Sequence, residues 1–399
     1  MAAAAVAAAA VTAIIPATSI AGADTPACAT AADTAAGSLA SAVAAAGGLE
    51  RLSGWASDDH AEALDALRRQ CTADGLRKRR KAEWLAALCG ELPAGADAGA
   101  ARAFFEAWFR PASDAAVAAG FLTGYYEPEV AASRVWTPAF AVPLYRRPPE
   151  LARIDPPGSA DGIPADMGYA ELRPDGTHGA FHDRPAIEAG ALAGRGLEFA
   201  FLASAIDAFF IHIQGSARLA FADGSTTRVG FDGKSGHPYT PIGRILAEQG
   251  AIPAGEVEMA TIRAWLDAHP AEGAQLMAQN RSFIFFREIG DAAADPGPIG
   301  AAGVPLTPLR SLAVDHDRVG YGTPLWIDAE LPIGDGGRLV RFQRLMIAQD
   351  TGSAIVGAGR GDIFFGSGAA AGAVAGRIKH WASVVPLEPR PEMLRRLER

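Results

Sequence analysis

Two stretches in the last third of the chain decide the fold: GPIGAAGVPLTPLRSLAVDHDRVGYGTPLWID (residues 297–328) and RLMIAQDTGSAIVGAGRGDIFFGSG (residues 344–368). Short apolar runs alternate there with Gly, Pro and Asp, which is typical of short strands joined by turns. Asp315 ends one apolar run, Asp350 ends the next long run, and Asp362 opens another. If these strands form one small barrel, their ends bring three carboxylates to one rim.

Such a group of carboxylates points to proton chemistry. Three crowded carboxylates cannot all ionise, so the pKa of one of them rises. An Asp that stays protonated near neutral pH can act as a general acid. The alternative is that strand-end aspartates only cap turns, and for any single one of them that interpretation would be preferred. The occurrence of all three in this spacing favours a function.

Composition bounds the other possibilities. With 399 residues the chain can form two packing units, and its 45 Gly and 27 Pro favour a loop-rich, β-rich protein. The formal net charge of -9 gives no reason to expect nucleic acid as a partner. No His or Cys spacing fits a metal site, and we expect neither metal nor cofactor. The single D-T-G at Asp350 lacks the second copy that an aspartic protease needs.

The N-terminus is typical of an exported protein. Residues 1–23 are apolar and end in Ala21-Gly22-Ala23, which fits a signal-peptide cleavage site. Residues 24–48 are Ala/Gly/Thr-rich and predict a flexible lead-in. Cys71 and Cys89 are predicted to form a disulfide, which suits an oxidising compartment; the alternative is two buried free thiols. Cys28 is left over, and the residues before it make a weak lipidation signal.

The order of elements favours barrels over a parallel βαβ sheet. A helical pattern runs from Leu49 to about Ala119, and short strands begin at Gly120. Residues 208–231 predict a β-hairpin that turns at residues 222–225. Helices are expected again at residues 240–250 and 257–280. Further strands are expected at residues 282–288, 310–315, 323–328, 342–350 and 361–365.

With these motifs in order, the chain resembles the MltA family of membrane-bound lytic murein transglycosylases, whose 3D domain is named for three aspartates. Asp315, Asp350 and Asp362 match those three. Further matches are residues 123–128, 184–190, 213–216, 235–244 and 280–288, so the resemblance covers about residues 49–386. The chain departs from the family pattern at Ser235, Ala217, Ser353 and Val356.

The resemblance implies a mainly β fold with an N-terminal helical region. Residues 49–125 would form the helical part of a main domain that residues 280–388, the 3D domain, complete as a double-psi β-barrel. Residues 126–279 would form a second, inserted β-barrel domain, with a glycan groove between the two domains. Residues 389–399 would be a C-terminal tail.

The resemblance also implies an activity. The family cleaves the β-1,4 bond between N-acetylmuramic acid and N-acetylglucosamine in peptidoglycan without water, giving 1,6-anhydromuramyl products. Asp362 would be the catalytic acid and then base, and Asp315 and Asp350 would support it. The expected partner is the glycan strand of peptidoglycan, and cell-wall enzyme complexes are a further candidate. We expect the protein to be a monomer in the periplasm. It would be attached to the outer membrane if Cys28 is lipidated.

The expected substrate-binding residues are Thr123, Gly124, Tyr125, Tyr126, Glu127, Gln214, Gly215, Ser216 and Arg218. The two tyrosines would otherwise be core or rim residues, and Glu127 a solvated turn residue. Gln214 is expected in the middle of a strand, where Gly215 would let a ligand approach the backbone. Two competing functions remain open, namely a non-catalytic polysaccharide-binding protein and a muramidase that uses water.

Overall fold

The computed structural model describes residues 48–77, 82–112, 119–290 and 297–397. Within these ranges the chain divides into two compact units. The insert unit comprises Tyr126–Pro298 and Ser367–Gly376, and the barrel unit comprises the rest of the described chain. The boundary between the two units falls between Tyr125 and Tyr126, inside one strand. After the chain has returned to the barrel unit, the short segment Ser367–Gly376 again belongs to the insert unit.

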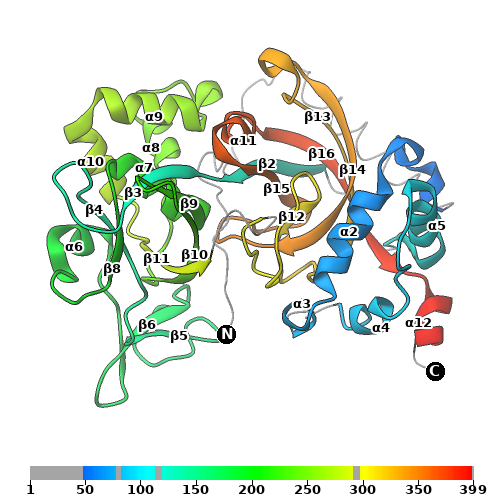
Figure 1. Cartoon of the computed structure of the whole chain (residues 1–399), viewed down its shortest axis with the longest axis horizontal. Coiled ribbons are helices and arrows are strands. Elements are labelled where there is room, and N and C mark those ends of the chain that lie inside the picture. Colours follow the sequence, from blue (N-terminus) through cyan, green and yellow to red (C-terminus); the bar gives the residue numbers. More distant parts are fainter. Residues whose placement is uncertain (1–47, 78–81, 113–118, 291–296, 398–399) are drawn as a thin grey trace, which may run out of the picture. The chain divides into compact units, whose positions relative to one another are not determined.

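The barrel unit contains a closed six-stranded β-barrel (Figure 1). Its strands follow each other around the ring in the order β16, β13, β14, β12, β15 and β2, and β2 pairs with β16 to close it. The bounds are β2 Ala119–Glu127, β12 Ser311–Val314, β13 Pro324–Leu331, β14 Val340–Asp350, β15 Arg360–Ser367 and β16 Lys379–Pro389, with β1 Phe109–Pro111 beside β16. The mainly β fold expected from the sequence is confirmed, and so are strands in the places of β12, β13, β14 and β15; β16 was not predicted.

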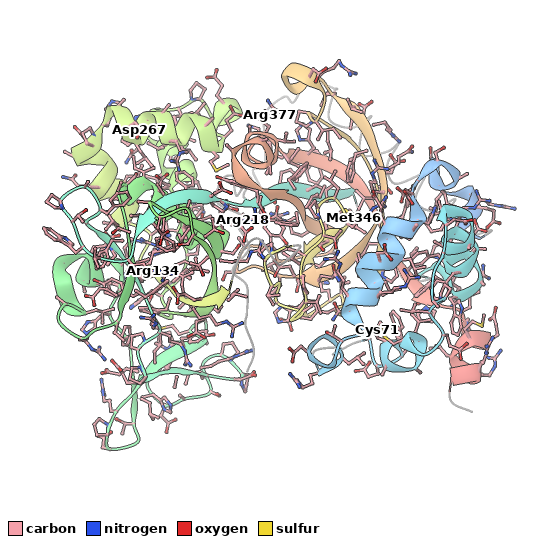
Figure 2. The ribbon with its side chains drawn as sticks, viewed as in Figure 1. Cys71, Arg134, Arg218, Asp267, Met346 and Arg377 are labelled. Carbon is pink, nitrogen blue, oxygen red and sulfur yellow. A yellow bond between two sulfur atoms is a disulfide. The ribbon has the colours of Figure 1, made fainter. Side chains whose placement is uncertain are left out.

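Alternation along the strands decides which side chains fill the barrel, since successive side chains point to opposite faces. On β13, Leu325 and Ile327 belong to the cluster inside the barrel, whereas Trp326 packs against the N-terminal helices. On β14, Met346 (labelled in Figure 2) likewise faces the interior and Leu345 faces the helices. Strands β13 and β14 are therefore apolar on both faces, because each separates two hydrophobic clusters.

The N-terminal helical region covers the outer face of the barrel. Its helices are α2 His60–Gln70, α3 Ala73–Arg77, α4 Leu85–Cys89 and α5 Ala98–Trp108, preceded by short 3-10 turns at Leu49–Arg51 and Trp55–Ser57. Asp59 caps α2 by accepting from the Ala61 amide. Its neighbour Asp58 is buried and instead accepts two hydrogen bonds from Arg310, at 2.8 and 2.9 Å. This ion pair joins the helices to the strand that begins with Ser311.

Cys71 and Cys89 form a disulfide in the structure, with their Cα atoms 5.6 Å apart (Figure 2 labels Cys71). The bond joins the residue after α2 to the last residue of α4. Closing a loop with a sequence separation of 18 stabilises the folded chain by roughly 3 kcal/mol on the chain-entropy model.

The insert unit is built on a six-stranded sheet ordered β11, β10, β9, β3, β8, β4. These strands are β11 Ile284–Gly290, β10 Thr226–Lys234, β9 Ser216–Phe221, β3 Glu129–Ser133, β8 Glu198–Leu202 and β4 Val142–Tyr145. A smaller sheet holds β5 Leu151–Arg153, β6 Tyr169–Leu172 and β7 His178–Gly179. The helices of this unit are α6 Arg184–Ala186, α7 Ala205–Gln214, α8 Ile242–Glu248, α9 Met259–Ala268, α10 Pro270–Ala278 and α11 Gly368–Ala375; α12 Pro391–Leu397 belongs to the barrel unit.

The hairpin predicted over residues 208–231 is only half correct. Strands β9 and β10 pair as expected, but the preceding residues form the helix α7, so Gln214 ends a helix and does not lie in a strand. The segment AFFIHIQ is almost entirely buried, and a helix that is apolar on every side shows no helical period. Ser204, which caps α7 by accepting from the Asp207 amide, and the left-handed Gly215 at its end are the signals that mark it.

The predicted signal peptide, most of the lead-in and Cys28 lie outside the described residues. None of the helices in the described ranges combines the length and the hydropathy that crossing a bilayer requires.

Candidate functional site

Asp362 lies on β15, on the outer face of the barrel wall. Its neighbour Ile363 is packed inside the barrel, so alternation directs Asp362 outward. The side chain is nevertheless 0% exposed. Its Oδ1 atom accepts a hydrogen bond from the Thr123 hydroxyl at 2.7 Å. Its Oδ2 atom has no hydrogen-bond partner among the residues that the structure describes.

Burial raises the pKa of Asp362 to about 7, from the ordinary value of 3.8. The Arg360 charge and the Thr123 hydrogen bond oppose this rise, and the Asp350 charge adds to it. The expectation that crowded carboxylates set this pKa therefore needs correction, because removal from water is the larger cause. A carboxyl group with a pKa near neutrality can both donate and accept a proton under working conditions.

Arg360 and Thr123 orient the carboxyl group. The Arg360 guanidinium donates from Nη2 to Thr123 Oγ1 at 2.7 Å, so the Thr123 hydroxyl directs its own proton to Asp362. Oδ1 is thereby occupied as an acceptor, and Oδ2 is the atom left to carry the exchangeable proton. Sequence reasoning missed Arg360, although its place two residues before Asp362 on one strand puts both on the same face.

Asp350 ends β14, and both of its carboxyl oxygens accept hydrogen bonds. Its Oδ2 atom accepts from the Tyr125 hydroxyl at 2.8 Å, and its Oδ1 atom accepts from the amides of Ala301 and Thr351 at 2.8 and 2.9 Å. Burial, together with the charge of Asp350 and this hydrogen bond, raises the pKa of Tyr125 well above 10, so the phenol remains a donor.

Asp315 follows β12 and holds two turns. It accepts from the Gly357 amide at 2.8 Å and the Asp317 amide at 3.1 Å, and it pairs with Arg318 at 3.4 Å. The charges that act on the pKa of Asp362 in the described chain come from Arg360 and Asp350. The geometry of Asp315 thus favours the turn-capping interpretation.

The two supporting aspartates should behave differently when replaced. Asp350→Asn should slightly lower the pKa of Asp362, because a like charge is removed, and shift the alkaline fall of kcat/KM to lower pH. Asp315→Ala should leave that profile in place and lower the free energy of unfolding by roughly 1–3 kcal/mol through lost hydrogen bonds to a charged group. pH–rate profiles and thermal unfolding of both variants check this. An unmoved profile with a lower melting point for Asp350→Asn would reject its tuning role.

The other candidate residues divide between the two units. Thr123, Gly124 and Tyr125 belong to the barrel unit with the three aspartates. Tyr126, Glu127, Gln214, Gly215, Ser216 and Arg218 belong to the insert unit. Within the insert unit, Gln214 Oε1 accepts from the Tyr126 amide at 3.3 Å. Gly215 has a φ of 74°, which favours glycine and ends α7.

Glu127 is not a solvated turn residue, as one reading of the sequence has it. It is 0% exposed and accepts from Arg228 at 2.6 and 3.2 Å. Arg218 (labelled in Figure 2) and Ser367 also donate to it, at 3.1 and 2.6 Å. This buried ion-pair cluster ties β2 to β9, β10 and the start of the Ser367–Gly376 segment. Its geometry favours a structural role for Glu127 and leaves only part of Arg218 accessible to a ligand.

No group of three or more His, Cys, Asp or Glu side chains in the described ranges is arranged to hold a metal ion. The protonatable group at the centre of the candidate site is Asp362, which Thr123 and Arg360 orient.

Two family models match the sequence of this chain. The family model of the MltA specific insert domain matches residues 121–287, and that of the 3D domain matches residues 310–388. Membrane-bound lytic murein transglycosylase A of Escherichia coli K12 is 34% identical over 275 residues. That match covers 67% of this chain and 66% of the relative, just under two thirds of its length.

Solved structures extend the likeness to nearly the whole described chain. A membrane-bound lytic murein transglycosylase from Agrobacterium tumefaciens is 39% identical with a TM-score of 0.74, over 88% of this chain and 98% of that one. MltA of E. coli with bound chitohexaose is 29% identical with a TM-score of 0.61, over 84% of this chain and 90% of that one. The chain therefore belongs to the MltA family of membrane-bound lytic murein transglycosylases.

Proposed function

We propose that this protein is a lytic transglycosylase that cleaves the β-1,4 bond between N-acetylmuramic acid and N-acetylglucosamine in peptidoglycan. The observation that supports this most directly is the state of Asp362. It is a buried carboxyl with a pKa of about 7, one oxygen held by Thr123 and the other without a partner among the described residues.

A single carboxyl group suffices if the substrate supplies its own nucleophile. Protonated Asp362 donates its proton to the glycosidic oxygen, and the bond from that oxygen to C1 of N-acetylmuramic acid breaks. The C6 hydroxyl of the same sugar attacks C1, and the Asp362 carboxylate accepts the proton that this hydroxyl releases. The products are a 1,6-anhydromuramyl end and a free C4 hydroxyl, and Asp362 is protonated again. Intramolecular attack has a large effective-molarity advantage over attack by water.

The state of Asp350 argues against a water-using mechanism. Glycoside hydrolases generally need a second carboxylate as nucleophile or as base for water. Among the described residues, Asp350 is the carboxylate whose charge acts on the pKa of Asp362, and three donors already bind its oxygens. An Asp so occupied is a poor nucleophile. Because Asp362 has no exposed surface, the groups that cover its Oδ2 have to move before a glycan can reach it.

The relatives support a proposal for the substrate and the location. The E. coli MltA structure contains chitohexaose, a β-1,4 polymer of N-acetylglucosamine, which supports glycan strands as the ligand of this chain. The relatives are named membrane-bound, and we propose the cell envelope as the place of action, in line with the exported N-terminus that the sequence predicts.

Analysis of the products of digested peptidoglycan tests the proposal. We expect purified protein to release muropeptides with 1,6-anhydromuramyl ends. Mass spectrometry identifies them, because each is lighter than the reducing-end species by the mass of one water molecule, about 18 mass units. Reducing ends would instead establish a muramidase. Binding of glycan without any product would establish a polysaccharide-binding protein, and either result would overturn the proposal.

A further inference from the structure

Trp381 is an exposed aromatic side chain on the barrel unit. It is 62% exposed, although large aromatic residues normally bury most of their surface. It lies on β16 opposite Phe121 of β2, and the two rings meet edge to face with centroids 5.4 Å apart. One edge of the indole is therefore held in place while much of its surface meets solvent.

The same strand face leads to the candidate acid. Phe121 and Thr123 are two residues apart on β2, so their side chains point to the same side, opposite Leu122, which packs inside the barrel. The Arg360 guanidinium lies 5.8 Å from the centre of the Phe121 ring and donates to Thr123. A continuous row of side chains thus runs from the exposed Trp381 to the hydroxyl that holds Asp362.

We infer that Trp381, supported by Phe121, is a stacking platform for a sugar ring of the glycan strand, next to the bond that Asp362 cleaves. The inference rests on the proposed function, since it assigns the place of one sugar relative to the acid. Two residues of a β-strand span about 7 Å, so the platform lies about one or two sugar units from the reacting bond. On the barrel unit, this platform would set the position of the glycan chain along the site.

The chemistry of the ring fits a saccharide. A pyranose presents a face of C–H groups with hydroxyls at its rim. A flat aromatic surface buries the C–H groups and leaves the hydroxyls in contact with water. Edge contact with Phe121 holds the indole before binding, so little side-chain freedom is lost when a sugar stacks on it. The aromatic surface of Trp381 and Phe121 continues toward the proposed acid, which suits the C–H faces of an extended glycan backbone.

Calorimetric titration with chitohexaose tests this, in an Asp362→Asn background that prevents turnover. Trp381→Ala should raise the Kd roughly tenfold, as the loss of one aromatic contact implies, and Trp381→Phe should recover most of the affinity. The matched control is Trp136→Ala, which removes a tryptophan of similar exposure, 60%, from the insert unit and should leave the Kd unchanged. With active protein on peptidoglycan, Trp381→Ala should affect KM more than kcat.

The outcomes separate the platform from the proposed function. If wild-type protein releases no anhydromuramyl ends, the function fails, whereas selective loss of chitohexaose binding in Trp381→Ala would still support the platform. If wild-type protein releases those ends and Trp381→Ala binds chitohexaose with the wild-type Kd, the platform is refuted. Equal losses in Trp381→Ala and Trp136→Ala would refute it too. Because Trp381 is exposed, its replacement should leave the melting temperature unchanged.

Discussion

Asp362→Asn should reduce glycan cleavage by about 10²- to 10⁴-fold, the usual contribution of a general acid–base group. Asn has the same shape and can still accept the hydrogen bond from Thr123, but it has no proton to give to the glycosidic oxygen. Binding of chitohexaose should persist, because the loss concerns chemistry and not the glycan contacts. Rates of anhydromuropeptide release by the two proteins, measured under the same conditions, provide the comparison.

The same variant should be more stable than the wild type at alkaline pH. The folded-state pKa of Asp362 is about 7 and the ordinary value is 3.8, so the folded protein binds more protons between these values. The free energy of unfolding then falls as pH rises through this window, by an amount on the order of 4 kcal/mol for an isolated site. Asp362→Asn removes this dependence, so its melting temperature should exceed that of the wild type at pH 8 and approach it near pH 4.

Asp317→Asn is the matched control, because it makes the same chemical change on a carboxylate of the barrel unit whose side chain is 73% exposed. It should change neither the cleavage rate nor the pH dependence of stability. Cleavage by Asp362→Asn within tenfold of the wild-type rate would refute the assignment of the acid, whatever its stability.

Glu127→Ala is expected to have the largest effect on stability. Glu127 and Arg228 are 0% and 1% exposed, and the substitution removes the carboxylate that Arg228, Arg218 and Ser367 share. Taking away one member of a buried ion pair costs roughly 3–5 kcal/mol, because the remaining charge keeps its desolvation cost. Calorimetric unfolding should show a lower melting temperature for the insert unit.

Glu129→Ala is the control for this change. Glu129 lies two residues further along the chain, is half exposed, and pairs with Arg218 at 3.9 Å, so its loss should cost less than about 1 kcal/mol. If Glu127→Ala unfolds like the wild type but binds chitohexaose poorly, Glu127 is a glycan contact, as the sequence first indicated, and the structural role is wrong.

The strands of the barrel could be predicted because their signals are local. Apolar runs bounded by Gly, Pro and Asp predicted strands in the places of β12 to β15. The closure of the barrel could not be predicted, since Thr123 and Lys379 become partners only through the whole topology. The helix α7 was missed because burial on all sides removes the period that distinguishes a helix from a strand.

The site was partly predictable, because some of its signals are local in the sequence. Asp362 stood out by its Gly-rich flank, and its proposed role needs no long-range information. Its pKa does need such information, since burial is a property of the folded chain. Glu127 shows the converse case: its charge predicted exposure, whereas Arg228 and Arg218, brought from other strands, make its burial tolerable.

The hydrogen bond between Thr123 and Asp362 joins positions 239 residues apart, and β2 reaches its other barrel partner only when β16 has been made. Contacts of such long range slow folding, because the intervening chain has to be ordered before they form. A chain emerging from the ribosome or threading through a membrane pore therefore has no oriented proton donor until nearly all of it has been released. Under the proposed function, the acid that cleaves the wall glycan is therefore oriented only after nearly the whole chain is available for folding.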